Sequence, residues 1–369
     1  MRIGIEAQRI FRDNPHGMDV FAINLINELV HLKEVSQIVV FVNSATKENN
    51  VLFKSEKISI ANFTGQFAIW EQIKLPRKAK KYDLDIIHFT SNTRSVRIHL
   101  PVLTTLHDTF FLDQNPLFRR GFSMYQRFGN MYRRTLFAFP SIYKGKYITV
   151  SKAELDRIRS RYSLDMKGFI YNGRNQIFEP KGNEESQDIL VKWGIKAPFI
   201  MHFGNTDPKK NTPRALEVIV EFLIRNKGHH AVIFDYQIDK NELNAPKEVK
   251  DRIKLLGYVP QVDLPYIYTM ADALFYPSLQ ESFGIPQIEA LACETPVVSG
   301  DCPALVEVSH ECAIHVDPTD NDAMLASLNA CVSTNALTAN ALLKAKKVVA
   351  GYNWKTTAEQ YLMEYKKLC

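Results

Sequence analysis

The sequence predicts an α/β protein made of two doubly wound, Rossmann-like domains. The chain has 369 residues, which exceeds the length of one ordinary domain. Hydrophobic residues make up 46% and charged residues 23%, as in a soluble globular protein. Short apolar segments alternate with helical segments along the whole chain, and this alternation is typical of parallel sheets covered by helices.

The first half contains five segments that are predicted to be strands: "RIGIE", "IVVFV", "DIIHFT", "VLTTLHD" and "KYITVS". A helix is predicted over Gly17–Leu32, with one apolar face formed by Val20, Ile23, Ile26 and either Leu29 or Val30. The first strand is not followed by G-x-G-x-x-G, so a dinucleotide fingerprint is not indicated.

The second half restarts the pattern with six predicted strands: "FIMHFG", "HAVIFDY", "IKLLGYV", "ALFYP", "PVVSG" and "AIHVD". Between the halves, residues 178–189 ("FEPKGNEESQDI") are polar and contain proline and glycine, so a linker is predicted there. We therefore expect one domain over 1–178 and a second over 179–350. Ligands bind doubly wound sheets at the carboxyl ends of their strands, which predicts a site between two facing domains.

Composition argues against several other classes of protein. No secretory signal pattern follows Met1, and no apolar run approaches the length of a membrane span. The five cysteines are odd in number and lack metal-ligand spacing, which favours reduced thiols and a cytoplasmic location. The net charge of +6 is unevenly divided, because residues 1–178 are net basic and the remainder is net acidic. This difference fits two domains with different partners.

The stretch "ESFGIPQIE" combines two acids with a helix start. Proline suits the first turn of a helix, so a helix is predicted to open at Pro286, with the amides of Gly284 and Ile285 free to bind phosphate. Glu281 and Glu289 flank those amides, and carboxylates accept hydrogen bonds from paired hydroxyls. The implied ligand has hydroxyls on both sides of a phosphate, which describes a nucleotide sugar. The alternative is that both acids are solvated or capping residues near a helix N-terminus.

Two further segments place polar residues after predicted strands. In "HFGNTDPKKN", Lys209 and Lys210 could neutralise a diphosphate and stabilise its departure, although surface lysines also serve solubility alone. In "TTLHDTFF", His107 follows an apolar strand, where an imidazole could hydrogen-bond a sugar or move a proton. A plain strand-end cap is the alternative for His107.

The segment "LLGYVPQVDLPYIYTMADALFYPSLQESFGIPQIEALACETPVVSGDCPALVEV" resembles the retaining nucleotide-sugar glycosyltransferases called group 1, or family four. The signature is an acid, seven residues and an acid around a Phe-Gly-aliphatic-Pro core, followed by a Pro-Val-Val strand. The similarity continues through "HFGNTDPKKN", "VSKAEL", "YNGRNQIF" and "YNWKTTAEQYLMEYKKL", so it covers most of the chain.

The resemblance implies a role for each matching residue. Glu281 would contact the transferred sugar, Glu289 the nucleotide ribose, and Lys210 the phosphate. His107 would lie at the site between the domains. Two positions depart from the family pattern, since the usual glycine doublet is reduced to Gly17 and an arginine is replaced by Asn205. Lys209 could compensate for the missing arginine.

The resemblance also implies a GT-B fold, in which a final helix within 351–369 crosses back to the N-terminal domain. It implies transfer of a hexosyl group with retention, with neither a bound metal nor a separate cofactor beyond the nucleotide-sugar donor. Similar chains often build bacterial surface polysaccharides on glycan or lipid-linked glycan acceptors, and GDP-mannose is the donor we expect. Two alternatives stay open. One is a glycoside hydrolase using Glu281 and Glu289 as acid and base, and the other is a nucleotide-sugar-binding subunit with a degraded site.

The segment Pro116–Phe137 contains arginines and aromatic residues but no acidic residue. A basic aromatic helix can lie on an anionic membrane, which would make the protein peripheral to the inner face of that membrane. The same helix could instead pack its aromatic residues inward and present its arginines to water. No recognition motif supports a nucleic-acid partner.

Overall fold

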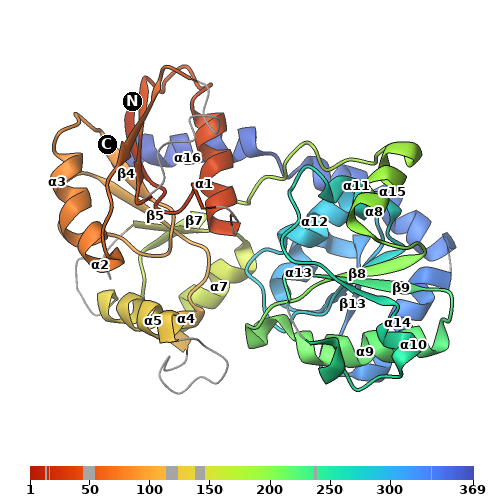
Figure 1. Ribbon diagram of the computed structural model, residues 1–369. Coiled ribbons are helices and arrows are strands. Elements are labelled where there is room, and N and C mark those ends of the chain that lie inside the picture. The colour runs from red at the N-terminus through yellow and green to blue at the C-terminus, as the bar shows by residue number, and fades with distance from the viewer. Residues whose placement is uncertain are drawn as a thin grey trace. The chain divides into compact units, whose positions relative to one another are not determined.

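The computed structural model describes residues 1–12, 15, 17–44, 55–113, 124–137, 146–236, 239–333 and 335–369. The chain divides into two compact units (Figure 1). The N-terminal unit contains Met1–Gly173 together with Asn353–Cys369, and the C-terminal unit contains Arg174–Tyr352. The sequence had placed the two boundaries at 178 and 350.

The N-terminal unit is built on a parallel sheet whose strands lie in the order β3-β2-β1-β4-β5-β6-β7. The strands are β1 Arg2–Glu6, β2 Gln37–Val42, β3 Ile58–Asn62, β4 Ile86–Phe89, β5 Val102–Leu106, β6 Lys146–Thr149 and β7 Met166–Phe169. The sequence did not predict β3 and β7. Both are edge strands and only partly buried, so their sequences lack the apolar run of a central strand.

The helices of this unit are α1 Gly17–Leu29, α2 Phe67–Ile69, α3 Leu75–Ala79, α4 Phe110–Asp113, α5 Met124–Leu136, α7 Lys152–Arg161 and α16 Trp354–Leu368, with a π-helical turn η1 at Trp70–Lys74. Helix α1 begins at the predicted residue, and its predicted apolar face is confirmed in part. Ile26 and Leu29 are buried as predicted, whereas Val20 and Ile23 are only partly buried. Phe21 and Leu25 are buried instead, because α1 packs against α16, a partner that periodicity does not reveal.

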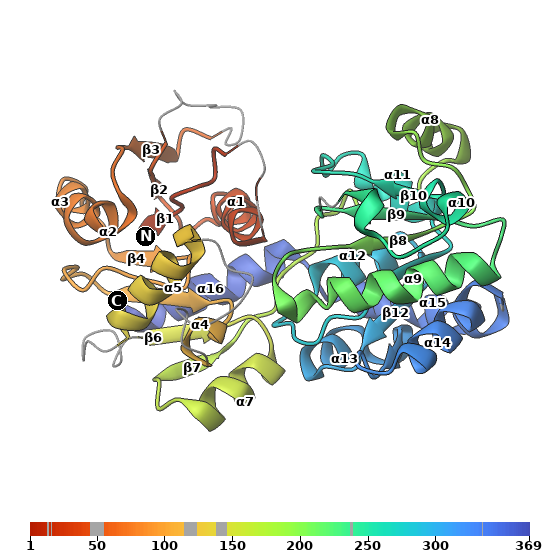
Figure 2. The same cartoon turned by 60° about the horizontal axis from the view of Figure 1, so that its bottom comes forward.

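Helix α16 is held in the N-terminal unit by a buried polar network. The Tyr365 hydroxyl lies 2.7 Å from His88 Nδ1, and His88 Nε2 lies 2.7 Å from Thr105 Oγ1. The Tyr361 hydroxyl lies 2.9 Å from the same Thr105 oxygen. Burial lowers the pKa of His88 to about 3, so its ring is neutral and can pair with uncharged hydroxyls. The last helix of the chain therefore completes the core of its first domain (Figures 1 and 2).

The C-terminal unit is built on a second parallel sheet, in the order β10-β9-β8-β11-β12-β13. The strands are β8 Phe199–Phe203, β9 His230–Phe234, β10 Ile253–Leu255, β11 Ala273–Tyr276, β12 Val297–Gly300 and β13 Ile314–Val316. The helices are α8 Asn183–Trp193, α9 Thr212–Arg225, α10 Lys247–Lys250, α11 Leu264–Met270, α12 Ile285–Ala292, α13 Pro303–Ser309, α14 Asn321–Ser333 and α15 Asn335–Ala350. Three 3-10 turns are η2 Pro208–Lys210, η3 Lys240–Glu242 and η4 His310–Cys312.

The predicted linker at 178–189 is largely helical. Helix α8 begins after Gly182, carries Glu184 and Glu185 in its first turn, and ends at Gly194 in a left-handed conformation. The polar composition of this segment reflects an exposed helix surface with acids at the positive end of the helix dipole.

Both sheets have a topological switch point, where consecutive connections leave in opposite directions. In the N-terminal sheet it lies between β1 and β4, and in the C-terminal sheet between β8 and β11. Loops that follow such strands carry the ligands of doubly wound folds. The fold therefore directs attention to the segments after β8 and β11.

Two other sequence-based expectations concern cysteines and membranes. All five cysteines are free thiols, of which four are buried and Cys369 is exposed. Among the described residues, no helix combines the length and the apolar character needed to cross a bilayer.

Gly173 offers a test of how closely α16 packs. A Cβ at this position would collide with the backbone nitrogen and Cα of Trp354, the first residue of α16. We expect Gly173→Ala to destabilise the protein by about 1–3 kcal/mol, the usual cost of overpacking a close contact. Thermal unfolding measures this effect. Gly228→Ala is the matched control, because a Cβ there meets no atom within 4 Å; equal melting temperatures for the two variants would contradict the prediction.

Candidate active site

The switch point of the C-terminal sheet brings together two predicted residues that lie far apart in the sequence. Lys210 Nζ, from η2 after β8, lies 2.6 Å from Glu281 Oε1, from the loop after β11. The hydroxyl of Tyr276, the last residue of β11, donates to the same Glu281 oxygen at 2.8 Å. Lys210 Nζ in turn donates to the Tyr276 hydroxyl at 2.9 Å. A cation, a carboxylate and a phenol thus form one closed group where the fold binds ligands.

Asn211 joins the loops that carry this group. It adopts a left-handed conformation (φ 57°), is buried, and donates from Nδ2 to the carbonyls of Pro277 (3.2 Å) and Pro318 (2.6 Å). The amide of Leu279 donates to the Lys209 carbonyl at 2.8 Å, which adds a second link. The sequence analysis assigned no role to Asn211. Its place immediately before the Thr-Pro start of α9 was the available signal, since asparagine tolerates left-handed turns.

Lys209 and Asn205 lie in the same loop but have different surroundings. Lys209 Nζ is 3.8 Å from Asp207 Oδ2 and makes a looser ion pair than Lys210 does. Asn205 is exposed, and its side-chain oxygen accepts from the amide of Asp207 at 2.9 Å. Asn205 therefore shapes the turn that precedes the two lysines.

Helix α12 starts beside this group. It begins at Ile285, one residue before the predicted start at Pro286, and its N-cap Gly284 has φ 94°. A Cβ on Gly284 would also collide with Leu305, so glycine is required there for two reasons. Within the described part of the chain, the amides of Gly284 and Ile285 donate to no acceptor. They remain available to an anion at the positive end of the helix.

The two glutamates have opposite electrostatic environments. Burial raises the pKa of Glu281, but Lys210, Lys209 and the Tyr276 hydroxyl outweigh it and hold that pKa below its usual value. Glu289 is 7% exposed and has no cationic partner among the described residues; the Tyr268 hydroxyl donates to its Oε2 at 3.3 Å. Burial raises the pKa of Glu289 to about 8. At neutral pH the first glutamate is therefore charged and the second largely holds its proton.

His107 and Gly17 belong to the N-terminal unit. His107 follows β5, its ring meets Phe21 of α1 edge-on at 4.7 Å, and its Nε2 lies 3.0 Å from the carbonyl of Thr90. A carbonyl can only accept, so Nε2 carries the proton and Nδ1 is left as an acceptor. Burial lowers the pKa of His107 to about 4, despite the nearby Asp108, so the ring is neutral. Gly17 is the exposed first residue of α1, and a Cβ there would meet nothing within 4 Å.

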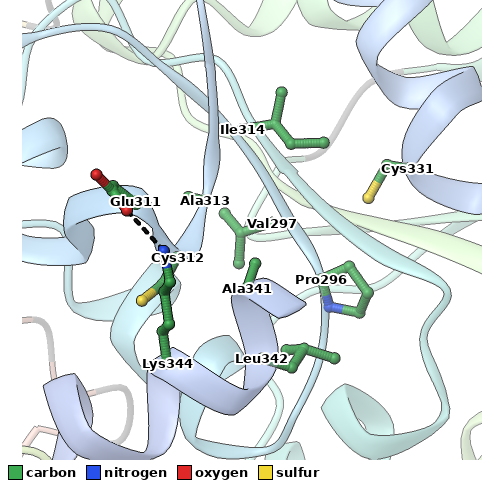
Figure 3. A pocket seen from close by; sticks show the side chains of 10 residues that line it. All are labelled: Pro296, Val297, Glu311, Cys312, Ala313, Ile314, Cys331, Ala341, Leu342 and Lys344. Atoms are coloured by element: carbon green, nitrogen blue, oxygen red, sulfur yellow. Dashed lines mark hydrogen bonds and ion pairs between the residues drawn. The ribbon is translucent and has the colours of Figure 1, made fainter. Parts of the chain in front are cut away.

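A pocket of about 280 Å³ lies elsewhere in the C-terminal unit (Figure 3). It is lined by Pro296 and Val297 at the start of β12, by Cys312 before β13, and by residues of α15 such as Lys344, which pairs with Glu311 at 2.8 Å. The pocket therefore lies at the amino ends of these strands, whereas the Lys210–Glu281 pair lies at the carboxyl ends of β8 and β11. None of the predicted site residues lines this pocket.

Family models match both halves of the chain. The model described as "Glycosyl transferases group 1" matches residues 186–348, and the model described as "Glycosyltransferase Family 4" matches residues 15–175. Each match falls within one of the two units, apart from the last two residues of the N-terminal match.

Curated proteins and solved structures show similar relationships. The chain is 28% identical over 199 residues to O-antigen chain mannosyltransferase B of Escherichia coli, covering 51% of each chain. It is 31% identical over 184 residues to O-antigen chain mannosyltransferase RfbU of Salmonella typhimurium, covering 47% of each. The chain thus spans about half the length of these curated relatives. The Anabaena protein HepE, solved in complex with UDP-glucose, has 18% identity and a TM-score of 0.74 over 100% of both chains, which shows a shared fold.

The opposite environments of the two glutamates predict opposite effects of pH on stability. The pKa of Glu289 is raised in the folded state, so between 4.5 and about 8 the folded chain holds a proton that the unfolded chain lacks. Stability therefore falls as pH rises through that window. We expect Glu289→Gln, which cannot ionise, to be more stable than the wild type by up to a few kcal/mol at pH 8.5, with a smaller difference at pH 5.

Glu281→Gln is the matched comparison. The pKa of Glu281 is lowered, so its contribution to stability is present above 4.5 and is lost as pH falls through its folded pKa. This variant should be less stable than the wild type at neutral pH. Denaturant unfolding at several pH values measures both differences, and the same pH trend in both variants would contradict the assignment.

Proposed function

Because this chain belongs to the group 1, or family four, glycosyltransferases, we propose that it transfers a hexosyl group from a nucleotide sugar to a glycan or lipid-linked glycan. The transfer retains anomeric configuration and needs no bound metal. The curated relatives act in O-antigen synthesis according to their names, which supports surface polysaccharide as the product.

The ion pair between Lys210 and Glu281 is the single observation that carries this proposal. It lies at the switch point of a doubly wound sheet, beside the two available amides at the start of α12. A cation and helix amides suit a diphosphate, and a carboxylate with an accessible oxygen suits sugar hydroxyls. The same arrangement gives a glycoside hydrolase no advantage, because hydrolysis requires no phosphate site.

The residues have distinct roles in the proposed step. The bond between the sugar C1 and the diphosphate oxygen breaks, and its electron pair leaves with the diphosphate. The acceptor hydroxyl oxygen forms the new bond to C1 and gives its proton to the departing diphosphate. Lys210, assisted by Lys209 and by the amides of Gly284 and Ile285, stabilises the charge on the leaving group. Glu281 accepts hydrogen bonds from hydroxyls of the transferred sugar, and Glu289 accepts hydrogen bonds from the ribose hydroxyls. His107, neutral with Nδ1 as an acceptor, binds a hydroxyl of the sugar.

The donor we propose is GDP-mannose. The names of the two curated relatives support mannose as the sugar, since both are called mannosyltransferases. HepE was solved with UDP-glucose, so nucleotide sugars with either base belong in the test.

A panel of nucleotide sugars tests the proposal directly. Thermal shift identifies the donor, because a ligand at a hundred times its dissociation constant adds about 2.7 kcal/mol of stability. Transfer to a glycan or lipid-linked acceptor is then measured with that donor. Tight donor binding without transfer to any acceptor would favour a degraded binding subunit. Release of free sugar from an aryl glycoside without nucleotide would favour a hydrolase.

The surface of helix α5 supports the proposal that the protein binds its acceptor at a membrane. Met124 and Phe128 are 64% and 59% exposed, and Met131 is exposed on the same side of the helix. Beside this apolar stripe, at helical spacing, lie the exposed Arg134 and the half-buried Arg127, and α5 contains no acidic residue. We call the five residues the α5 surface. Its composition matches an interfacial helix on an anionic bilayer.

The aromatic residues of α5 do not all face the same way: Tyr132 packs inward, whereas Phe128 is exposed. The Tyr132 hydroxyl donates to buried Glu71 at 2.6 Å, and its ring meets Phe67 edge-on at 5.1 Å. Helix α4 packs beside α5 in both views (Figures 1 and 2). Packing inward therefore accounts for Tyr132 and leaves Phe128 exposed. Arg119 and Arg120 also belong to the segment Pro116–Phe137, but they lie outside the described residues.

Lys210→Ala tests the cation at the leaving group. We expect turnover to fall by two to three orders of magnitude, which corresponds to about 3 kcal/mol of lost transition-state stabilisation. Lys209→Ala should have a smaller effect, because its ion pair lies outside the Lys210–Glu281–Tyr276 group. Steady-state kinetics with the identified donor measures both. Negligible effects from both substitutions would contradict the proposed role of the lysines.

Vesicle sedimentation tests the α5 surface. We expect the protein to bind anionic but not neutral vesicles at low salt, since each arginine near an anionic bilayer contributes about 1 kcal/mol. Charge reversal at Arg127 and Arg134 should abolish this binding, and Met124→Ser with Phe128→Ser should weaken it. Val191→Ser is the control, because Val191 is an apolar residue on a helix of the other unit and is even more exposed, at 77%. Equal recovery with both vesicle types, or with neither, would refute a membrane role.

A further inference from the structure

Tyr276 lies at the centre of the charged group without having been singled out by any sequence motif. It is the last residue of β11 and is only 1% exposed. Its hydroxyl donates to Glu281 Oε1 at 2.8 Å and accepts from Lys210 Nζ at 2.9 Å, while those two charged atoms are 2.6 Å apart. One neutral hydroxyl therefore uses its donor on the anion and its acceptor on the cation.

This arrangement divides the hydrogen-bonding capacity of Glu281. Oε1 accepts from both Lys210 and Tyr276, whereas Oε2 has no hydrogen-bond partner within the described part of the chain. The Glu281 side chain is 11% exposed, so the carboxylate still reaches solvent. One oxygen is thus occupied internally and the other is available to a ligand.

The N–H donors of Lys210 are likewise shared between internal partners and a possible ligand. An ammonium group has three N–H donors, and two of them are used by Glu281 and Tyr276. The third donor has no acceptor within the described part of the chain, and the side chain is 21% exposed. Without the phenol, the Lys210 ammonium could donate to both carboxylate oxygens of Glu281. Glu281 Oε2 and the third N–H of Lys210 would then bond to each other instead of to a ligand.

We propose that Tyr276 is a positioning residue, whose hydroxyl fixes Glu281 and Lys210 so that one carboxylate oxygen and one N–H remain for the nucleotide-sugar donor. This inference rests on the proposed function for its consequence in catalysis, but the geometry that it describes belongs to the protein without ligand. The phenylalanine ring has the same shape as the tyrosine ring, so Tyr276→Phe removes the hydroxyl and preserves the packing.

The titration of Glu281 reports the loss of the hydroxyl. The groups that face this carboxylate are Lys209 and Lys210 from η2, Tyr276 from β11 and Cys302 at the start of α13. The Tyr276 hydroxyl is one of the groups that lower the pKa of Glu281 by bonding to its charged form. Tyr276→Phe should therefore raise that pKa, and it should move the acid limb of the pH–rate profile to higher pH.

Carbon-13 NMR of the labelled glutamate side chains in the ligand-free full chain measures this pKa, with Glu281→Gln identifying the signal. We expect the titration of Glu281 to shift to higher pH in Tyr276→Phe. We also expect turnover to fall ten- to a hundred-fold, as for loss of a hydrogen bond to a charged group, with a smaller change in the Michaelis constant for donor.

Tyr365→Phe is the matched control, because Tyr365 is a fully buried tyrosine of the N-terminal unit whose hydroxyl bonds His88. It should leave the Glu281 titration and the pH–rate profile unchanged. An unshifted Glu281 titration in Tyr276→Phe, or equal kinetic effects in both variants, would overturn the inference. If the wild type transfers no sugar, the proposed function fails, and the titration still decides whether Tyr276 positions Glu281.

Discussion

The structure of the C-terminal site depends on one partly buried ion pair, between Lys210 and Glu281. Removing two charges from water is costly unless their geometry is good and their remaining hydrogen bonds are satisfied. Here the pair is short, and Tyr276 bonds both partners. Lys210 follows β8 and Glu281 follows β11, so the ion pair also connects the two loops on either side of the switch point. The links through Asn211 and Leu279 hold the same loops and keep the charged side chains in register.

The same pair explains how two carboxylates can lie beside an anion-binding helix start. Two ionised glutamates near the amides of Gly284 and Ile285 would repel a phosphate. Glu281 is neutralised by Lys210, and burial without a cation keeps Glu289 protonated at neutral pH. The region therefore carries less negative charge than its sequence suggests. A ligand whose hydroxyls donate to Glu289 would add hydrogen bonds to the one that the Tyr268 hydroxyl donates to it.

The N-terminal unit depends on residues from the far end of the chain. Phe21 of α1 meets the rings of His107, His88, Trp354 and Tyr361, so helix α16 and the histidine after β5 share one aromatic cluster. Loss of α16 would expose that cluster, including the buried His88. On another side of this unit, Tyr132 anchors α5 to Glu71, which leaves the opposite side of the helix free to present apolar and basic side chains. Core packing and surface chemistry are thus separated on a single helix.

The sequence by itself determined the α/β class, every central strand and the family, because those depend on apolar runs and on a motif whose residues are adjacent in the chain. It also placed Lys210, Glu281 and Glu289 in the candidate site. It wrongly assigned Val20 and Ile23 to the buried face of α1, missed edge strands β3 and β7, and took part of α8 for a linker, since each depends on which element packs alongside. Only the tertiary structure decided that Glu281 is charged while Glu289 is protonated, and that Tyr276 and Asn211 hold the loops. A pKa and a hydrogen bond are set by neighbours that are distant in sequence, such as Lys210 and Glu281, and local sequence carries no record of which residues the fold will bring within 3 Å of each other.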